Sequence, residues 1–284
     1  MIKVGMNLLL WSDDAKYDRH KGLLDFCKGV GFDGVEFNVG IVSDPSECEK
    51  FGAYARDLGL DVTTVGTFDP GVCNPVSPDA DLRAQVFPQF RKFIDSTIRL
   101  GGKLICGPLH QGLGYFSGAR PTQQEWDWSI ETMRPCFEYA RDHGVTVAVE
   151  PLNRFESYLF NTVAEAVRYV REIDLDNVGL LVDTMHSNIE ELDIARAYRE
   201  ALPYIRHVHI SENDRGIPGT GHACPREVFD VFREGGYEGY LTIEAFNLGA
   251  PSLTGALHLW RTFAPSDDDL ARQGHDYIRR MLRA

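Results

Sequence analysis

Short apolar runs alternate with amphipathic stretches along this chain. Eight runs have the length of β-strands, at residues 2–10, 34–38, 62–66, 103–109, 146–150, 178–183, 205–210 and 241–244. Between them, apolar positions recur with the period of an α-helix, for example at residues 23–30, 48–58, 82–100, 126–142 and 164–173. Glycine follows several of these helical stretches, as expected where a left-handed turn precedes the next strand. Eight alternating units predict an α/β protein with a closed (β/α)₈ TIM barrel.

The length of the chain and the positions of its loops fit one such barrel. A barrel of this type needs about 250 residues, and the chain has 284. We therefore expect a single domain over residues 1–284. Residues 69–78 and 110–121 are predicted to be long loops after strands three and four, where such loops build a pocket. Residues 246–265 are predicted to cover the mouth of the barrel, before a last helix at residues 267–282.

Four of the apolar runs carry a potential metal ligand as their last inward-pointing residue. These ligands are Glu150 in TVAVE, Asp183 in VGLLVD, His209 in IRHVHI and Glu244 in LTIE. Successive side chains of a β-strand face opposite ways, so parity sorts each run into two faces. In all four runs the face opposite the ligand is aliphatic. A parallel strand covered by helices requires this, since its outer face is buried while its inner end can hold a polar site.

The spacing of these four residues matches consecutive β/α repeats. They are separated by 33, 26 and 35 residues along the chain, and one βαβ unit runs to about thirty residues or more. Each interval can hold one loop, one helix and one strand. We therefore predict that the four side chains lie on neighbouring strands, at the same end of the barrel.

Composition argues against several kinds of partner. The chain has 29 Lys and Arg against 42 Asp and Glu, a net charge of −13, and no basic run. Such a surface repels phosphate backbones and anionic membranes, so we expect no nucleic-acid partner. No stretch approaches the roughly twenty apolar residues that span a bilayer, and we expect a cytoplasmic protein without a membrane partner. The six cysteines form no CxxC pair, which is typical of reduced, partly buried thiols.

The types of the four predicted ligands indicate the chemistry. Three carboxylates and one imidazole make a mostly oxygen-donor site, which favours Mn²⁺, Mg²⁺ or Co²⁺ over a thiolate-bound zinc. We expect Mn²⁺. Such an ion can polarise a carbonyl oxygen and chelate an adjacent hydroxyl, so the natural substrate is an α-hydroxy carbonyl compound.

The loops that follow the ligands add polar groups at the same end of the barrel. Glu156, His186 and Arg215 are candidates for holding substrate oxygens, although Arg and Glu near loop ends also pair with one another. We favour Asn153, Arg154 and Glu212 much less for this role. The inward residue His207 is expected to be either packed in the core or a support behind the ligands rather than a ligand, and Glu36 could likewise be such a support.

Four segments resemble those of a known family. EPLNRFE, DTMHSNIEE, HVHISENDR and the IEAF of the eighth strand resemble the signature segments of the ketose 3-epimerases, the D-tagatose and D-allulose 3-epimerase group within the xylose-isomerase-like TIM barrels. The resemblance implies that Glu150, Asp183, His209 and Glu244 bind a divalent metal, typically manganese. It also implies that Glu156, His186 and Arg215 hold the C1 to C3 end of a ketose, and that the protein is a homo-oligomer, a dimer or tetramer.

The resemblance implies a mechanism as well. Glu150 and Glu244 would exchange the C3 proton on opposite faces of a small-molecule sugar, through a cis-enediolate, and so invert C3. The chain departs from the family at Asn7, where an aromatic residue is common, and in HQGLG at residues 110–114, which lacks an apolar, Trp-bearing loop. His110 could either contact a substrate hydroxyl or cap its loop. These departures concern the part of the pocket that would receive C4 to C6.

Other functions share parts of this site. An aldose-ketose or hydroxypyruvate-type isomerase, or a lyase acting on a 3-oxo sugar, could use the same metal and enediolate. A metal-dependent phosphodiesterase of the endonuclease type needs a histidine-rich, multi-metal cluster and a basic groove, and the acidic composition disfavours it. A non-catalytic sugar-binding protein does not explain two opposed glutamates among the ligands.

Overall fold

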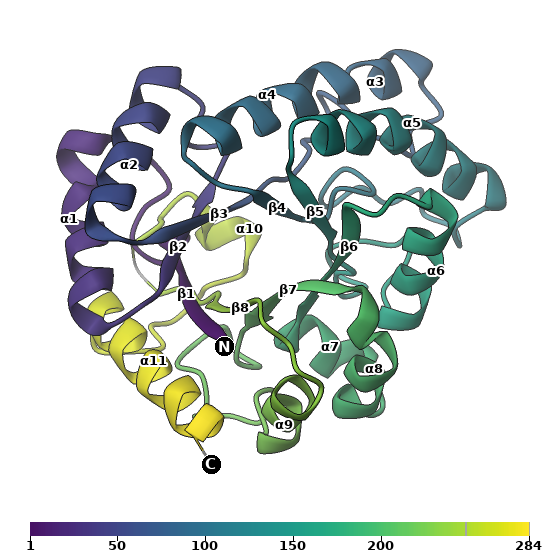
Figure 1. The fold of residues 1–284 in the computed structure, drawn as a ribbon. Helices are drawn as coiled ribbons and strands as arrows, with labels where there is room; N and C mark the ends of the chain where they lie inside the picture. The colour runs from purple at the N-terminus through teal and green to yellow at the C-terminus, as the bar shows by residue number, and fades with distance from the viewer. Residues whose placement is uncertain (248, 284) are drawn as a thin grey trace.

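The eight predicted strands form a closed parallel barrel in the computed structural model, which describes residues 1–247 and 249–283 (Figure 1). Each strand pairs with its neighbours in sequence, and β1 pairs with β8 to close the ring. The strands are β1 (Lys3–Asn7), β2 (Gly34–Asn38), β3 (Asp61–Val65), β4 (Leu104–Gly107), β5 (Thr146–Val149), β6 (Val178–Asp183), β7 (Ile205–Ile210) and β8 (Tyr240–Ile243). The predicted (β/α)₈ fold class is confirmed.

The helices surround the ring of strands on its outside, except the short α10 (Leu253–Ala256), which is seen through the ring (Figure 1). They are α1 (Tyr17–Val30), α2 (Pro45–Leu58), α3 (Ala80–Ala84), α4 (Val86–Arg99), α5 (Gln123–Asp142), α6 (Val163–Ile173), α7 (Thr184–Glu190), α8 (Ile194–Ala201), α9 (Arg226–Glu234), α10 (Leu253–Ala256) and α11 (Asp267–Arg283), with short 3₁₀ turns η1 (Leu8–Leu10) and η2 (Leu202–Tyr204). The single helix predicted at residues 82–100 is in fact two, because the chain is interrupted at Gln85 between α3 and α4.

Two predicted strands were too long, each for a local reason. The first was expected over residues 2–10 but ends at Asn7, whose side-chain oxygen accepts a hydrogen bond from the Leu9 backbone nitrogen at 2.9 Å. That bond starts the turn η1. The fourth was expected over residues 103–109 but ends at Gly107, which has a φ of 123°. Only glycine adopts such a conformation at little cost, and it turns the chain out of the sheet.

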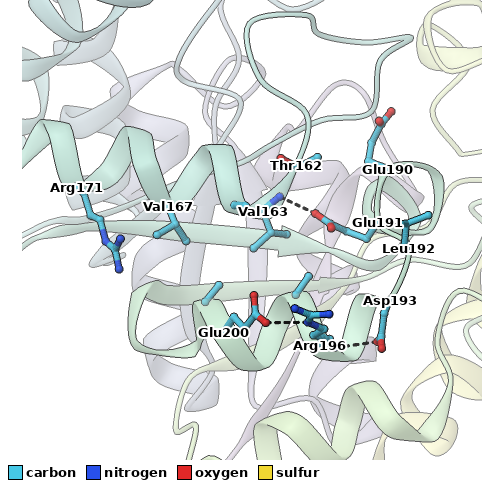
Figure 2. Close-up of a pocket in the computed structure, with 13 residues that line it drawn as sticks. Thr162, Val163, Val167, Arg171, Glu190, Glu191, Leu192, Asp193, Arg196 and Glu200 are labelled. Atoms are coloured by element: carbon cyan, nitrogen blue, oxygen red, sulfur yellow. Dashed lines mark hydrogen bonds and ion pairs between the residues drawn. The ribbon is translucent and has the colours of Figure 1, made fainter.

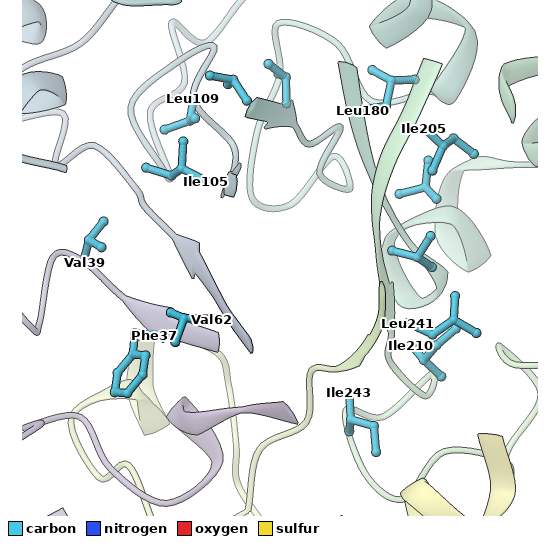
Figure 3. Close-up of a cluster of buried hydrophobic side chains, with 14 of the residues drawn as sticks. Phe37, Val39, Val62, Ile105, Leu109, Leu180, Ile205, Ile210, Leu241 and Ile243 are labelled. Carbon is cyan, nitrogen blue, oxygen red and sulfur yellow. The ribbon is translucent and has the colours of Figure 1, made fainter. Parts of the chain in front are cut away.

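The parity prediction for the strands is confirmed by two separate apolar clusters. Val147 and Val149 of β5 belong to the large cluster between the barrel and its helices, part of which is drawn in Figure 3. Ala148, between them in sequence, belongs to a small cluster inside the barrel together with Leu181 of β6. The outer faces of the strands are thus buried under helices, and the inner faces are left for small and polar residues.

The segment after β8 packs over the C-terminal ends of the first strands. Phe246 and Leu259 form a cluster with Leu9, which follows β1, and Ile41, which follows β2, packs against it. The approach is close, since a Cβ at Gly249 would lie 2.4 Å from the Leu10 carbonyl oxygen. In Figure 1, α10 of this segment is seen through the ring of strands. These contacts agree with the prediction that residues 246–265 cover the mouth.

All six cysteines are buried free thiols. No helix within residues 1–247 and 249–283 combines the length and the apolar character needed to cross a bilayer.

Candidate active site

The four predicted ligands lie at the C-terminal ends of four consecutive strands. Glu150 directly follows β5, Asp183 ends β6, His209 is the penultimate residue of β7 and Glu244 directly follows β8. Asp183 and His209 are paired in register between β6 and β7. All four lie at the same end of the barrel, because the strands are parallel and each ligand stands at or next to the last residue of its strand. The sequence-based placement of these residues at one end of the barrel agrees with the structure.

Several atoms of this group are buried without a hydrogen-bond partner among the described residues. They are Oε1 of Glu150, Oδ2 of Asp183 and Nδ1 of His209. The His209 Nδ1 lies 3.5 Å from Oε1 of Glu244 and 4.0 Å from Oδ2 of Asp183. Buried polar atoms are usually paired, so unpaired lone pairs that converge indicate a missing ligand.

The donor set fits a divalent cation. Asp183 belongs to two groups of potential ligands, and within each group the ligand atoms lie within 4.8 Å of one another. The first group joins Asp183 to Glu150 and His186, and the second joins it to His209 and Glu244. Carboxylate oxygens with one imidazole suit Mn²⁺ or Mg²⁺. The residues present therefore fit the metal that the sequence predicts.

Arg215 lies beside these carboxylates. Its Nη1 is 2.5 Å from Oε2 of Glu244 and 3.8 Å from Oδ2 of Asp183. Burial acts to lower the pKa of Arg215, but the Glu244 and Asp183 carboxylates outweigh it and raise the pKa, so the guanidinium stays charged. The backbone of Arg215 has a φ of 64°, which is rare for a residue with a side chain. It is held by hydrogen bonds on both sides, to the Glu212 carbonyl and from the Phe246 nitrogen.

His186 and Glu156 complete the polar wall around Arg215. Nη2 of Arg215 lies 3.1 Å from Nε2 of His186 and 3.7 Å from Oε1 of Glu156. The Asn153 backbone nitrogen donates to Nδ1 of His186 at 3.1 Å, and its side-chain amide donates to Glu156 at 2.9 Å. Burial lowers the pKa of His186, so its ring is neutral near neutral pH. Asn153, which we favoured little as a substrate contact, thus holds both neighbouring side chains in place.

The two glutamates of the group differ in their electrostatic environment. Burial raises the pKa of Glu150 well above its ordinary value, and the nearby Glu244 and Asp183 act in the same direction. Burial also acts to raise the pKa of Glu244, but His209 and Arg215 outweigh it and lower the pKa to about 2. In the metal-free protein Glu150 therefore favours its protonated form and Glu244 its ionised form. Carboxyl groups with opposite shifts are typical of an acid and base pair.

Behind the ligands, Glu36 is fully buried inside the barrel and contacts both histidines of β7. Its Oε1 lies 2.8 Å from Nε2 of His209, and its Oε2 lies 2.9 Å from Nε2 of His207. The supporting position expected for Glu36 and His207 agrees with these contacts. Asn7 and Thr63 also hydrogen-bond to Glu36, and sequence reasoning missed both. Asn7 on β1 and Thr63 on β3 are paired in register with Glu36. Their inward-facing positions on neighbouring strands were the signal that could have identified them.

Three other polar residues near the mouth have structural contacts. Neither ring nitrogen of His110 has a hydrogen-bond partner among the described residues, and the ring stacks on Phe160 with 3.9 Å between centroids. Its ring therefore does not cap the loop. Arg154 forms an ion pair with Glu190 at 2.8 Å. Glu212 accepts hydrogen bonds from backbone nitrogens of its own loop, including that of Gly219 at 2.9 Å.

A surface pocket of about 590 Å³ lies elsewhere, on the outer wall of the barrel between α6 and α8 (Figure 2). Its lining includes Val163 and Val167 of α6, Leu192, and Arg196 and Glu200 of α8. The seven predicted site residues are not among the residues that line it. The convergent lone pairs, and not this pocket, mark the candidate active site.

Comparison with known proteins agrees with this geometry. The family model described as xylose isomerase-like TIM barrel matches residues 24–281. The chain belongs to this family. Among its members, an L-ribulose 3-epimerase of Mesorhizobium japonicum is 32% identical over 98% of this chain and 93% of its own length. A probable ketose 3-epimerase of Synechocystis is 30% identical over 98% and 96%.

Solved structures of family members superpose on nearly the whole barrel. An L-ribulose 3-epimerase has a TM-score of 0.93 and 30% identity, covering 100% of this chain and 95% of its own. A D-psicose 3-epimerase with D-tagatose from Clostridium cellulolyticum H10 has a TM-score of 0.90 and 28% identity, covering 99% of both chains. The chain is therefore an isomerase-class enzyme related to the ketose 3-epimerases, as its sequence segments indicated. A 3-dehydro-D-guloside 4-epimerase of Escherichia coli is also 30% identical, over 77% of this chain and 84% of its own length.

Proposed function

We propose that this family member epimerises a free ketose at C3, with Glu150 and Glu244 as the proton-transferring pair. The observation that carries the proposal is the convergence of unpaired ligand atoms between two glutamates whose pKa values are shifted in opposite directions. The names of the relatives support C3 as the reacting carbon.

A divalent cation is part of the proposal. Glu150, Asp183, His209 and Glu244 would hold it, and we favour Mn²⁺, with Mg²⁺ or Co²⁺ possible on the same oxygen-rich donor set. When bound, the cation supplies Lewis acidity: it polarises the substrate carbonyl and makes the proton on the adjacent carbon easier to remove.

The proton transfer itself belongs to the two glutamates. One takes the C3 proton as a base, leaving a cis-enediolate, and the other returns a proton to the opposite face of C3. Glu150 is buried and the side chain of Glu244 is only 12% exposed, which limits the access of bulk water to the intermediate. The roles of the two glutamates exchange when the reaction runs in the other direction.

Arg215, His186 and Glu156 would hold the C1 to C3 end of the sugar. Nδ1 of His186 accepts a hydrogen bond from the Asn153 backbone, so Nε2 carries the proton of the neutral ring. Nε2 of His186 and Nη2 of Arg215 are then two donors that face each other at 3.1 Å. A substrate oxygen placed beside them accepts from both and relieves this opposition, whereas an apolar group does not.

The test is an exchange experiment in D₂O with purified protein, Mn²⁺ and a panel of free ketoses. We expect deuterium at C3 together with the C3 epimer, read by NMR. Exchange at C1 would instead indicate an aldose-ketose or hydroxypyruvate-type isomerase, and loss of a substituent would indicate a lyase on a 3-oxo sugar.

The relative from Escherichia coli defines a matched control for this panel. Its name places the reaction at C4, next to a carbonyl at C3, so a 3-dehydro sugar should be tested beside the ketoses. Turnover confined to that compound, with deuterium at C4, would contradict the C3 assignment. The homo-oligomeric state and the cytoplasmic location stay predictions.

A further inference from the structure

Glu36 lies at the centre of the barrel and is surrounded by hydrogen-bond donors. Oε1 accepts from Nδ2 of Asn7 at 3.0 Å and is 2.8 Å from Nε2 of His209. Oε2 accepts from Oγ1 of Thr63 at 3.0 Å and from Sγ of Cys106 at 3.5 Å. Oε2 also lies 2.9 Å from Nε2 of His207. Each oxygen thus has at least two partners, which is the number of lone pairs it offers.

The orientation of the Asn7 amide is fixed from its other side. Its Oδ1 accepts from the Leu9 backbone nitrogen, so Nδ2 must point to Glu36 and can only donate. Glu36 therefore acts as an acceptor, as an ionised carboxylate.

The consequence for His209 follows from the two ends of its ring. A carboxylate next to Nε2 requires a proton on that nitrogen. The other nitrogen, Nδ1, faces Glu244 and Asp183 and has no hydrogen-bond partner among the described residues. With one proton held at Nε2, Nδ1 is the nitrogen left to face those carboxylates, and it is the one that can offer a lone pair to a cation when it carries no proton.

We propose that Glu36 is a positioning residue that fixes His209 with the proton on Nε2, so that Nδ1 is the atom available to a divalent cation. The inference rests on the proposed metal site and adds to it the residue that sets the ligand's tautomer and ring orientation. Partners of this kind behind a metal-binding histidine typically change metal affinity by about 10 to 100-fold.

A competing interpretation is a second metal site made of Glu36 itself with Cys106, His207 and His209, whose ligand atoms also lie within 4.8 Å of one another. A cation there would need Nε2 of His209 and would displace the hydrogen bonds that saturate Glu36. The observed hydrogen bonds therefore favour the positioning role.

The test compares Mn²⁺ binding by wild-type protein and Glu36→Gln, measured by EPR of free Mn²⁺ without substrate. We expect a Kd weakened by about 10 to 100-fold in the variant, because a neutral amide oxygen beside Asn7 and His209 holds the Nε2 proton less strongly than a carboxylate does. Thr63→Val is the matched control: it removes one hydrogen bond to Glu36, keeps the carboxylate, and should leave the Kd unchanged.

The outcomes separate this inference from the proposed function. A wild-type protein that binds no Mn²⁺ contradicts the metal site itself. A folded Glu36→Gln variant with the wild-type Kd overturns the positioning role alone, and two ions per chain would favour the competing site. If the variant does not fold, ¹⁵N NMR of histidine-labelled wild-type protein with saturating Mg²⁺ decides: a proton on Nε2 of His209 is expected, and a proton on Nδ1 overturns the inference.

Discussion

The two halves of the barrel treat their inward polar side chains in opposite ways. On β1 to β3, Asn7, Glu36 and Thr63 are paired in register and hydrogen-bond to one another. At the ends of β5 and β6, Glu150 and Asp183 each leave a buried carboxylate oxygen without a partner among the described residues. The first arrangement is complete in the protein alone, whereas the second becomes complete only with a ligand.

The difference shows how a barrel can be both stable and reactive. A saturated polar network in the interior costs little, because each donor finds an acceptor. Unpaired carboxylates cost stability, but they are ready to bind a cation or move a proton. The hydrogen bond between Glu36 and His209 joins the two halves, so the saturated side orients a ligand of the open side.

The largest expected effect is the loss of activity when a carboxylate of the proposed active site is replaced. Glu150→Gln and Glu244→Gln should each lower C3 exchange in D₂O by about 10³-fold, within the range that proton transfer by a positioned side chain contributes. Glu190→Gln, on α7 and paired with Arg154, is the matched control and should exchange at the wild-type rate. Exchange within about tenfold of wild type in either site variant would remove that residue from the pair.

Removing the metal should affect stability as well as activity. At about 100 times its Kd, Mn²⁺ should add about 2.7 kcal/mol to the free energy of unfolding relative to chelated protein. For a chain of this size that is a rise in Tm of about 5 to 10 °C, measurable by differential scanning fluorimetry. Asp183→Asn, which can still cap α7, should show no such rise. Full activity after exhaustive chelation would contradict the metal requirement.

His110, which follows β4, has ring nitrogens without a hydrogen-bond partner among the described residues, unlike the polar side chains on β1 to β3. We therefore expect it to make the stability of the protein depend on pH. Burial lowers its pKa to about 3, while an unfolded histidine titrates near 6.5. As pH falls below that value, the unfolded chain binds a proton that the folded ring refuses, so stability falls. Between pH 7.5 and 5 this costs about 2 kcal/mol.

His110→Phe should lack this loss, because phenylalanine does not titrate and can stack on Phe160. Urea unfolding of both proteins at the two pH values gives the comparison, and only the difference in pH dependence matters, so a constant packing effect cancels. Equal pH dependence in the two proteins would show that the ring of His110 is protonated without cost.

The smallest expected effect separates the two catalytic glutamates themselves. In chelated protein, Glu150→Gln should raise the free energy of unfolding by about 1 kcal/mol, since it removes a buried carboxyl group near Glu244 and Asp183. Glu244→Gln should instead lower it, because Glu244 is paired with Arg215. Shifts of the same sign would mean that the two environments are not opposed.

Periodicity alone predicted the barrel and the end of the barrel at which the four proposed ligands lie. Strand parity depends only on the spacing along one strand, and closure of eight parallel strands brings equal levels together. The ends of elements were less accurate, because a single bond can decide them: the Asn7 side chain stopped β1 three residues early. Gln85 likewise divides one predicted helix into two.

Contacts across the barrel could not be predicted from the sequence. Glu36 and His209 are 173 residues apart, and their contact depends on how wide the ring is and which residues at that level are small. Asn153 was undervalued for a related reason: its backbone nitrogen contacts Nδ1 of His186 in addition to its side-chain amide. Backbone donors carry no signature in the amino-acid letters.

Because the backbone of Arg215 is left-handed, we expect the residue that is best for stability at this position to differ from the residue that is best for turnover. Glycine and asparagine adopt this conformation more easily than arginine does, so a library varied at position 215 and sorted by resistance to heat should enrich those two residues. The same library sorted by sugar conversion should return arginine. The difference in thermal stability between the two selected variants measures the stability lost at this one position by keeping a cation beside the carboxylates.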